Sequence, residues 1–309
     1  MIELPQRCFI GRVNPRWFAR MRPLYINYTG SETLSNFQVK FTLTSSDIPF
    51  NKIRPDERDL LFVDENNNVI PHWIESSNGS QIEMWLCFPE IRTGRSVFFL
   101  YFGNPSFLSG EDGSLVFDFF TDFENLSGWE DYQSAWSHVT NQGHDNNAAY
   151  GDKEVDDNNL FQYENSMPSD PRVYESRVKV EQLGYADPEN WDSFGMFIAS
   201  GPNDQTPSLS LTITRGMGLR LVVVRSDGVR STDQQNLAPV STGTWYILGI
   251  LLDGSNTKAF LDYEEKTSVT DSNANFSPRY FAFNAYDSSG WVDWARVRKY
   301  TAVYPVIET

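Results

Sequence analysis

The stretch NFQVKFTL, residues 36–43, alternates apolar and polar side chains. Successive side chains of an extended chain point to opposite faces of a sheet, so one face carries Phe37, Val39, Phe41 and Leu43. The stretch IEMWLCF, residues 82–88, has the same alternation. Both patterns are typical of strands with one face in a core, and no helical period competes with them. We therefore expect a small β-sandwich over residues 22–105.

A second set of strand patterns follows a connector rich in glycine and serine. The connector is GNPSFLSGEDGS, residues 103–114, and we place the linker at 106–114. About nine strand patterns then run to residue 309 without an intervening helix, which is typical of a larger jelly-roll sandwich. The predicted fold class is all-β, with a small sandwich before a larger one at 115–309.

Composition excludes several classes of function. The 309 residues carry a formal net charge of -16, which disfavours a nucleic-acid partner. No apolar run reaches the roughly 20 residues of a membrane span, and the N-terminus lacks the apolar stretch of a secretory signal, so we expect no membrane insertion. The two cysteines, Cys8 and Cys87, cannot build a disulfide framework, and three dispersed histidines disfavour zinc. Calcium, which binds oxygen ligands, stays possible.

Residues 1–21 form an arginine-rich arm. The first 22 residues hold five arginines and one glutamate, whereas the rest of the chain is strongly acidic. One interpretation is a solvated terminus. The other is an assembly contact with an acidic neighbour, either another copy of this chain or a different structural protein. The candidate contact residues are Arg7, Arg12, Arg16, Trp17 and Arg20.

Three stretches carry a family resemblance: residues 22–43, residues 59–75, and the pair 84–91 and 96–105. Together they resemble an uncharacterised domain family, a domain of unknown function found in extracellular and phage tail proteins. That family is typically followed by a concanavalin-A-like lectin/glucanase sandwich. FDFFTDFENLSGW at 117–129 and WVDWARVRKY at 291–300 are similar to the first and last strands of such a sandwich. The resemblance implies a jelly-roll fold that hosts lectins, glycan-binding modules, glycanases and structural modules.

The stretch DFFTDFE, residues 118–124, places acidic residues at alternate positions. Retaining glycanases need two carboxyl groups about 5–5.5 Å apart, and neighbours on one strand face, such as Asp122 and Glu124, can meet that distance. The glucanases of the resembled fold carry Glu-x-Asp-x-Glu on one strand. Here Phe120 interrupts the alternation between Asp118 and Asp122. The pattern therefore favours a protein without glycoside hydrolase activity.

Calcium binding is implied by the same resemblance. Jelly-roll glycan-binding modules that begin with a pattern such as FENLSGW, residues 123–129, often hold a structural Ca²⁺ between the first-strand acid and an aspartate of the last strand. The corresponding residues are Glu124 and Asp293, with Asp122 nearby. The alternative is that these acids face water on separate strands.

Tryptophans supply the other candidate chemistry, because the apolar faces of sugar rings stack on aromatic side chains beside polar groups. Several of the nine tryptophans, including Trp291, lie in loop-like sequence. Trp245 and Trp294 lie within strand patterns, and we expect them in the core. Trp191 is the strongest candidate because polar residues flank it. The candidate ligand-binding residues are Trp129, Trp136, Asn190, Trp191 and Asp192.

The arm, the resemblance and the modular layout together favour a virion surface protein of the phage tail or fibre type. Its arm would anchor it to other virion proteins or to copies of itself in a homo-oligomer, and its larger sandwich would bind host-surface glycans. The alternatives are a decoration protein without glycan binding, a carbohydrate-binding module of a secreted, extracellular protein, and, less favoured, a glycanase.

Overall fold

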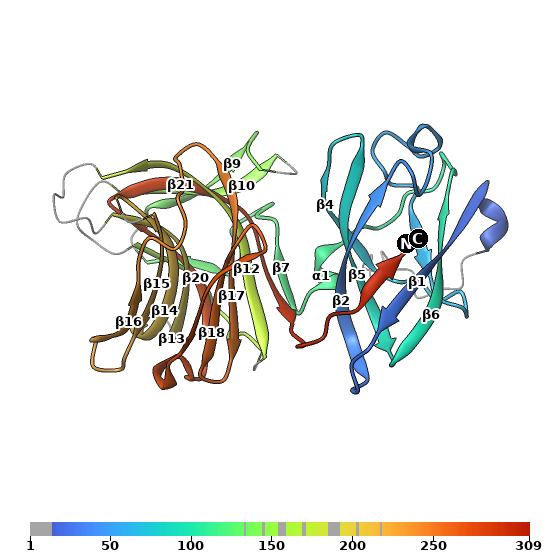
Figure 1. The fold of residues 1–309 in the computed structure, drawn as a ribbon. Helices are drawn as coiled ribbons and strands as arrows, with labels where there is room; N and C mark the ends of the chain where they lie inside the picture. The colour runs from blue at the N-terminus through green and yellow to red at the C-terminus, as the bar shows by residue number, and fades with distance from the viewer. Residues whose placement is uncertain are drawn as a thin grey trace, which may run out of the picture. The chain divides into compact units, whose positions relative to one another are not determined.

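A computed structural model describes residues 14–132, 134–143, 146–153, 159–168, 171–184, 192–201, 204–216 and 218–309. The chain divides into two compact units, which Figure 1 shows in ribbon form. The smaller unit contains the described residues up to Asp118 together with Thr301–Thr309. The larger unit is Phe119–Tyr300, so along the chain it is an insertion into the smaller one. No helix in the described part of the chain is long and apolar enough to span a membrane.

The smaller unit is a sandwich of two antiparallel sheets. One sheet has the order β22–β1–β6–β3 and the other the order β2–β5–β4. The predicted alternation over residues 36–43 is confirmed, because Phe37, Val39, Phe41 and Leu43 are all buried in the core between the sheets. The strands are β1 (Arg20–Tyr28), β2 (Leu34–Thr44), β3 (Leu61–Val63), β4 (His72–Ser77), β5 (Gln81–Ile91), β6 (Gly94–Phe102) and β22 (Val306–Glu308).

The unit boundaries differ from the predicted ones at three places. Strand β22 returns to the smaller unit, where it pairs with β1 and packs Ile307 against the core. The predicted linker also folds onto this unit, since Ser109 is buried and its N–H donates to the carbonyl of Arg58. In the predicted arm, Phe18 is buried against Tyr101. Each segment completes hydrogen bonds or apolar burial that the predicted sandwich of 22–105 lacks.

The larger unit is a jelly-roll sandwich, as predicted. One sheet has the order β19–β18–β17–β12–β21–β10–β9, with β7 also pairing with β21, and the other has the order β16–β15–β14–β13–β20–β11–β8. The pairing of β7 with β21 joins the first and last strands. The strands are β7 (Phe119–Thr121), β8 (Trp129–Asp131), β9 (Trp136–Thr140), β10 (Asn147–Lys153), β11 (Asn159–Tyr163), β12 (Arg172–Leu183), β13 (Ser193–Gly201), β14 (Asp204–Thr214), β15 (Gly218–Val224), β16 (Arg230–Gln234), β17 (Trp245–Asp253), β18 (Asn256–Leu261), β19 (Glu264–Thr270), β20 (Tyr280–Tyr286) and β21 (Ser288–Lys299).

Helical structure among the described residues is short. The segments are the 3-10 helices η1 (Pro15–Trp17), η2 (Phe50–Lys52) and η3 (Ser272–Ala274), and the helix α1 (Gly113–Val116).

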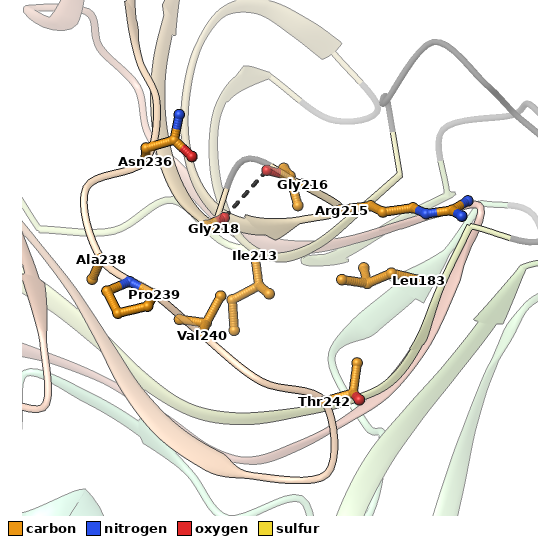
Figure 2. Close-up of a pocket in the computed structure, with 11 residues that line it drawn as sticks. Leu183, Ile213, Arg215, Gly216, Gly218, Asn236, Ala238, Pro239, Val240 and Thr242 are labelled. Carbon is orange, nitrogen blue, oxygen red and sulfur yellow. Dashed lines mark hydrogen bonds between the residues drawn. The ribbon is translucent and has the colours of Figure 1, made fainter.

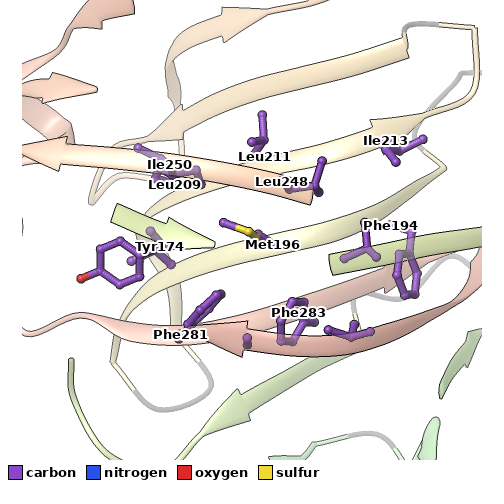
Figure 3. Close-up of a cluster of buried hydrophobic side chains, with 14 of the residues drawn as sticks. Tyr174, Phe194, Met196, Leu209, Leu211, Ile213, Leu248, Ile250, Phe281 and Phe283 are labelled. Carbon is purple, nitrogen blue, oxygen red and sulfur yellow. The ribbon is translucent and has the colours of Figure 1, made fainter. Parts of the chain in front are cut away.

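The core of the larger unit shows which side of each strand is available to a ligand. Figure 3 shows Tyr174, Met196, Leu248 and Phe283 among the side chains that fill the space between the sheets. On β17 the residues that belong to this core cluster are Leu248, Ile250 and Leu252, and on β12 its members Val178 and Val180 flank Lys179. Because side chains alternate along a strand, Lys179 and Trp245 point to the opposite, outer face of the eight-stranded sheet.

Candidate functional site

Two of the predicted ligand-binding tryptophans belong to the core. Trp129 and Trp136 are each 8% exposed. Their rings lie 4.9 Å and 4.8 Å from the ring of Phe161, in stacked orientations. A ring covered in this way cannot stack on a sugar, so the prediction for Trp129 and Trp136 is wrong. Apolar burial outweighs the polar residues next to them in the sequence.

Of the strongest candidate ligand-binding segment, residues 190–192, the structure describes only Asp192. Asn190 and Trp191 lie outside the described residues. Asp192 is fully buried, and its Oδ2 lies 4.0 Å from Nη1 of Arg215. Asp192 is therefore in a position to orient Arg215 but not to bind a ligand directly.

The carboxylates of residues 118–124 do not share one strand face. Strand β7 ends at Thr121, and Phe123 adopts a φ of 55° that turns the chain into the core. Asp122 Oδ1 accepts a hydrogen bond of 3.2 Å from the backbone N–H of Glu124. Glu124 itself is exposed. The predicted alternation therefore ends before it can pair Asp122 with Glu124 across a groove.

Asp293 has a different partner from the one that the calcium prediction requires. It is 2% exposed, and Nη1 of Arg177 donates to its Oδ2 over 2.5 Å. Among the residues that the structure describes, no three His, Cys, Asp or Glu side chains are grouped so that they could hold a metal ion. Asp122, Glu124 and Asp293 thus do not form such a group, and Asp293 is paired with Arg177 instead. Calcium binding stays a prediction.

Apart from the buried Phe18, the residues of the arm whose burial the structure describes are exposed. Arg7 and Arg12 lie outside the described residues. Arg16 and Arg20 are exposed, and Trp17 is 62% exposed. An exposed tryptophan between two arginines fits a contact surface, since such residues are enriched at protein interfaces.

A different group of side chains forms a row across the outer face of the eight-stranded sheet. Lys179 of β12 is paired in register with Trp245 of β17 on one side and with Trp291 of β21 on the other. Trp291 is in turn paired with Tyr150 of β10. All four side chains are half-buried. We call Trp245, Lys179, Trp291 and Tyr150 the outer row; the four strands are neighbours in Figure 1.

Cation–π and ring contacts hold the outer row together. Nζ of Lys179 lies 4.2 Å from the ring centre of Trp291 and 4.9 Å from that of Trp245. The same ammonium donates to Oε1 of Gln142 over 3.0 Å. The rings of Tyr150 and Trp291 are 5.1 Å apart. These contacts fix the side chains before any ligand arrives, which lowers the entropic cost of binding.

Polar groups border the outer row. The hydroxyl of Tyr150 donates to Oε2 of Glu181 over 3.0 Å. Partial burial, assisted by Glu181 and Asp152, raises the pKa of Tyr150 to about 12, so the hydroxyl keeps its proton at neutral pH. Arg177, which pairs with Asp293, lies 4.8 Å from the ring centre of Trp245. The face therefore combines aromatic surface with hydrogen-bonding donors and acceptors.

Sequence reasoning treated Trp245 as a core residue and so missed most of the outer row. The signal was nevertheless present in WYILGILLD, residues 245–253, because Leu248, Ile250 and Leu252 are separated from Trp245 by odd numbers of residues. Strand periodicity therefore puts Trp245 on the face opposite to these leucine and isoleucine residues.

Comparisons with known proteins bear on the family and on the fold. Residues 56–140 match the family described as "Domain of unknown function (DUF2341)", which confirms the resemblance to an uncharacterised domain family over that range. No curated protein matches the chain.

Solved structures that are similar to this chain include carbohydrate-binding modules and glycoside hydrolases. The carbohydrate-binding module CBM66 from Bacillus subtilis is 14% identical, with 57% of this chain and 98% of that chain covered and a TM-score of 0.44. A GH16 protein of the Bacteroides ovatus mixed-linkage glucan locus, solved with its product, is 11% identical, with coverages of 58% and 99% and a TM-score of 0.42. The Crh5 transglycosylase in complex with NAG is 10% identical, with coverages of 60% and 86% and a TM-score of 0.45.

Proposed function

We propose that the larger unit, Phe119–Tyr300, is a carbohydrate-binding module that holds a glycan chain along the outer row. The observation that carries this proposal is the register of Trp245, Lys179, Trp291 and Tyr150 on four neighbouring strands. Indole and phenol rings offer apolar surface to the C–H faces of sugars. The row therefore supplies repeated stacking positions along one line.

The direction of the row sets the direction of the bound glycan. Neighbouring strands lie about 4.8 Å apart, so the distance from Trp245 to Tyr150 is on the order of 14 Å. A ligand that uses the whole row lies across the strands and spans several sugar units. This geometry favours an internal stretch of an oligosaccharide over a single monosaccharide.

Binding without hydrolysis is the activity that the neighbouring acids favour. Two of the described carboxylates near the row are engaged, Asp293 with Arg177 and Glu181 with Tyr150. Glycoside hydrolysis needs one carboxyl that protonates the leaving group and a second that acts as base or nucleophile. Asp293 is 2% exposed and ion-paired with Arg177, so it is poorly placed to reach the leaving group of a bound glycan. We therefore propose a non-enzymatic protein.

A glycan array followed by titration calorimetry on the best oligosaccharide tests the proposal. Replacing Trp291 with alanine is expected to weaken binding by about 2 kcal/mol, or roughly thirtyfold, because a central aromatic contact is lost. Trp245→Ala is expected to have a similar effect. Trp17→Ala is the matched control, since Trp17 is 62% exposed but belongs to the smaller unit. Unchanged affinity in both row variants, or an array without any bound glycan, would refute the proposal.

We also propose that the protein is displayed on the surface of a virion and that the arm anchors it there, through another virion protein or another copy of the chain. The arginines of the arm and the exposure of Trp17 support this proposal. A long basic segment would be attracted to the acidic surface of a partner.

A photo-reactive phenylalanine analogue placed at Trp17 tests the anchor on the natural assembly. We expect cross-links to another acidic protein or to another copy, detected by mass spectrometry. The control is the same analogue at Val229, which is 51% exposed on the larger unit and is expected to give no such product. Cross-links from position 17 to its own smaller unit alone would contradict the anchor.

A further inference from the structure

The larger unit has a cavity that is separate from the outer row. Its volume is about 610 Å³, and it lies between the turn that joins β14 to β15, the segment that joins β16 to β17, and the end of β12. Figure 2 shows Ile213, Leu183 and Val240 around one space, with Thr242 on the side away from Asn236. None of the lining residues belongs to the outer row. The volume lies within the range of small-molecule sites, about 300–1,000 Å³.

The walls of the cavity combine apolar and polar surface in similar amounts. Leu183, Ile213, Pro239 and Val240 contribute the apolar surface. Arg215, Asn236 and Thr242 contribute hydrogen-bonding groups. Such a combination suits a small ligand that has one apolar face and a polar rim, as the ring of a monosaccharide has.

A buried acid lies close to Arg215 at the cavity. Its side chain is 55% exposed, whereas the carboxylate of Asp192, 4.0 Å away, is 0% exposed. This separation makes an ion pair but is too long for a hydrogen bond, so the pairing does not use the N–H donors of the guanidinium. The carboxylate thus lies at ion-pair distance from the guanidinium, and the side chain of Arg215 stays accessible to solvent.

Gly184 makes this arrangement possible. Its φ is +72°, and a Cβ built on it would lie 2.2 Å from Oδ2 of Asp192 and 2.5 Å from Nη1 of Arg215. Any other residue at position 184 would push the acid and the guanidinium out of place. The chain thus has a close backbone approach at the point where Asp192 and Arg215 meet.

We propose that this cavity binds a single sugar residue that carries a carboxylate, with Arg215 as the group that recognises the charge. A guanidinium presents paired N–H donors that match the two oxygens of a carboxylate. The apolar face of the sugar packs on Pro239 and Val240, and Asn236 and Thr242 are placed to bind its hydroxyl groups. The site is independent of the outer row and does not rest on the function proposed for it.

Titration of the full chain with uronic acids tests this assignment. D-glucuronate and D-galacturonate are the probes, and D-glucose and D-galactose are their neutral counterparts. We expect at least one uronate to bind saturably, about tenfold or more tighter than its neutral counterpart. Arg215→Gln is expected to remove most of that preference. Val240→Trp, which fills the cavity, is expected to weaken binding of the uronate by a similar factor.

Two control variants distinguish binding in this cavity from binding elsewhere on the protein. Arg225→Gln removes a comparable arginine, 42% exposed and paired with Asp227, that does not line the cavity, and it is expected to leave uronate binding unchanged. Trp291→Ala is expected to leave it unchanged as well, whereas it weakens binding of an oligosaccharide to the outer row. Equal binding of uronates and neutral sugars, no saturable uronate binding, or an Arg215→Gln protein that binds like the wild type would overturn the proposal.

Discussion

Replacing Glu175 with alanine is expected to destabilise the larger unit by about 3–5 kcal/mol, because it removes the carboxylate of a buried ion cluster. Glu175 is 2% exposed. Nε of Arg296 donates to its Oε2 over 2.7 Å, and Nη2 of Arg298 donates to its Oε1 over 2.8 Å. Arg296 is 0% exposed, so loss of the carboxylate leaves its guanidinium charge buried without this counter-ion, which is unfavourable.

The contribution of Glu175 to the stability of the larger unit depends on pH, because only the ionised carboxylate pairs with the arginines. Burial acts to raise the pKa of Glu175, but the positive charges of Arg298 and Arg296 outweigh burial and the pKa is lowered. A carboxyl with a lowered pKa contributes its full stabilisation above its pKa in the unfolded chain. The contribution is then lost as the pH falls through the pKa of the folded state. Glu175→Ala is therefore expected to make stability less sensitive to acid.

The matched control is Glu265→Ala. Glu265 also forms an ion pair, 2.7 Å from Nζ of Lys258, but its side chain is 42% exposed. An exposed pair of this kind contributes about 0–1 kcal/mol. Guanidinium unfolding of both variants, followed by far-UV circular dichroism and fitted with a separate transition for each unit, gives the comparison. If both variants lost the same free energy of unfolding, the buried ion cluster of Glu175 would contribute no more to stability than an exposed ion pair.

Replacing Trp129 with alanine is expected to cost about 3–5 kcal/mol, since the change leaves a large cavity in the core. The ring of Trp129 lies 5.2 Å from that of Phe123, 4.9 Å from that of Phe161 and 5.6 Å from that of Phe283. Trp291→Ala removes a half-buried side chain from the outer row, and we expect it to cost about 1 kcal/mol. The same unfolding assay measures both variants. A larger loss for Trp291 than for Trp129 would contradict the assignment of Trp129 to the core.

Residues 36–43 and Trp129 show which parts of the structure the sequence predicts and which it does not. The alternation of apolar and polar residues predicted the buried face of residues 36–43 correctly, because that pattern is contained within a single strand. The polar neighbours of Trp129 in SGWEDY indicated a loop, yet the ring enters the core from the first position of β8. Local composition describes the solvent preference of the neighbours and not the direction of the side chain itself.

Long-range pairing accounts for the other differences. The family resemblance implies calcium at Asp293, whereas in the structure its partner is Arg177, which lies 116 residues earlier in the chain. Strand β22 has only three residues and joins β1 at the other end of the sequence. Which residues become such partners depends on the order of the strands in the sheet, and this order cannot be predicted from one short stretch of sequence.

Fluorine NMR of the full chain labelled with 5-fluorotryptophan tests the outer row most directly. The nine tryptophans give separate probes, and each resonance is assigned by replacing one tryptophan with phenylalanine. On titration with the oligosaccharide identified by the array, we predict that the resonances of Trp245 and Trp291 shift, whereas those of Trp129 and Trp136 stay in place. Shifts at other tryptophans while Trp245 and Trp291 remain unchanged would place the glycan elsewhere and contradict the proposed function of this face.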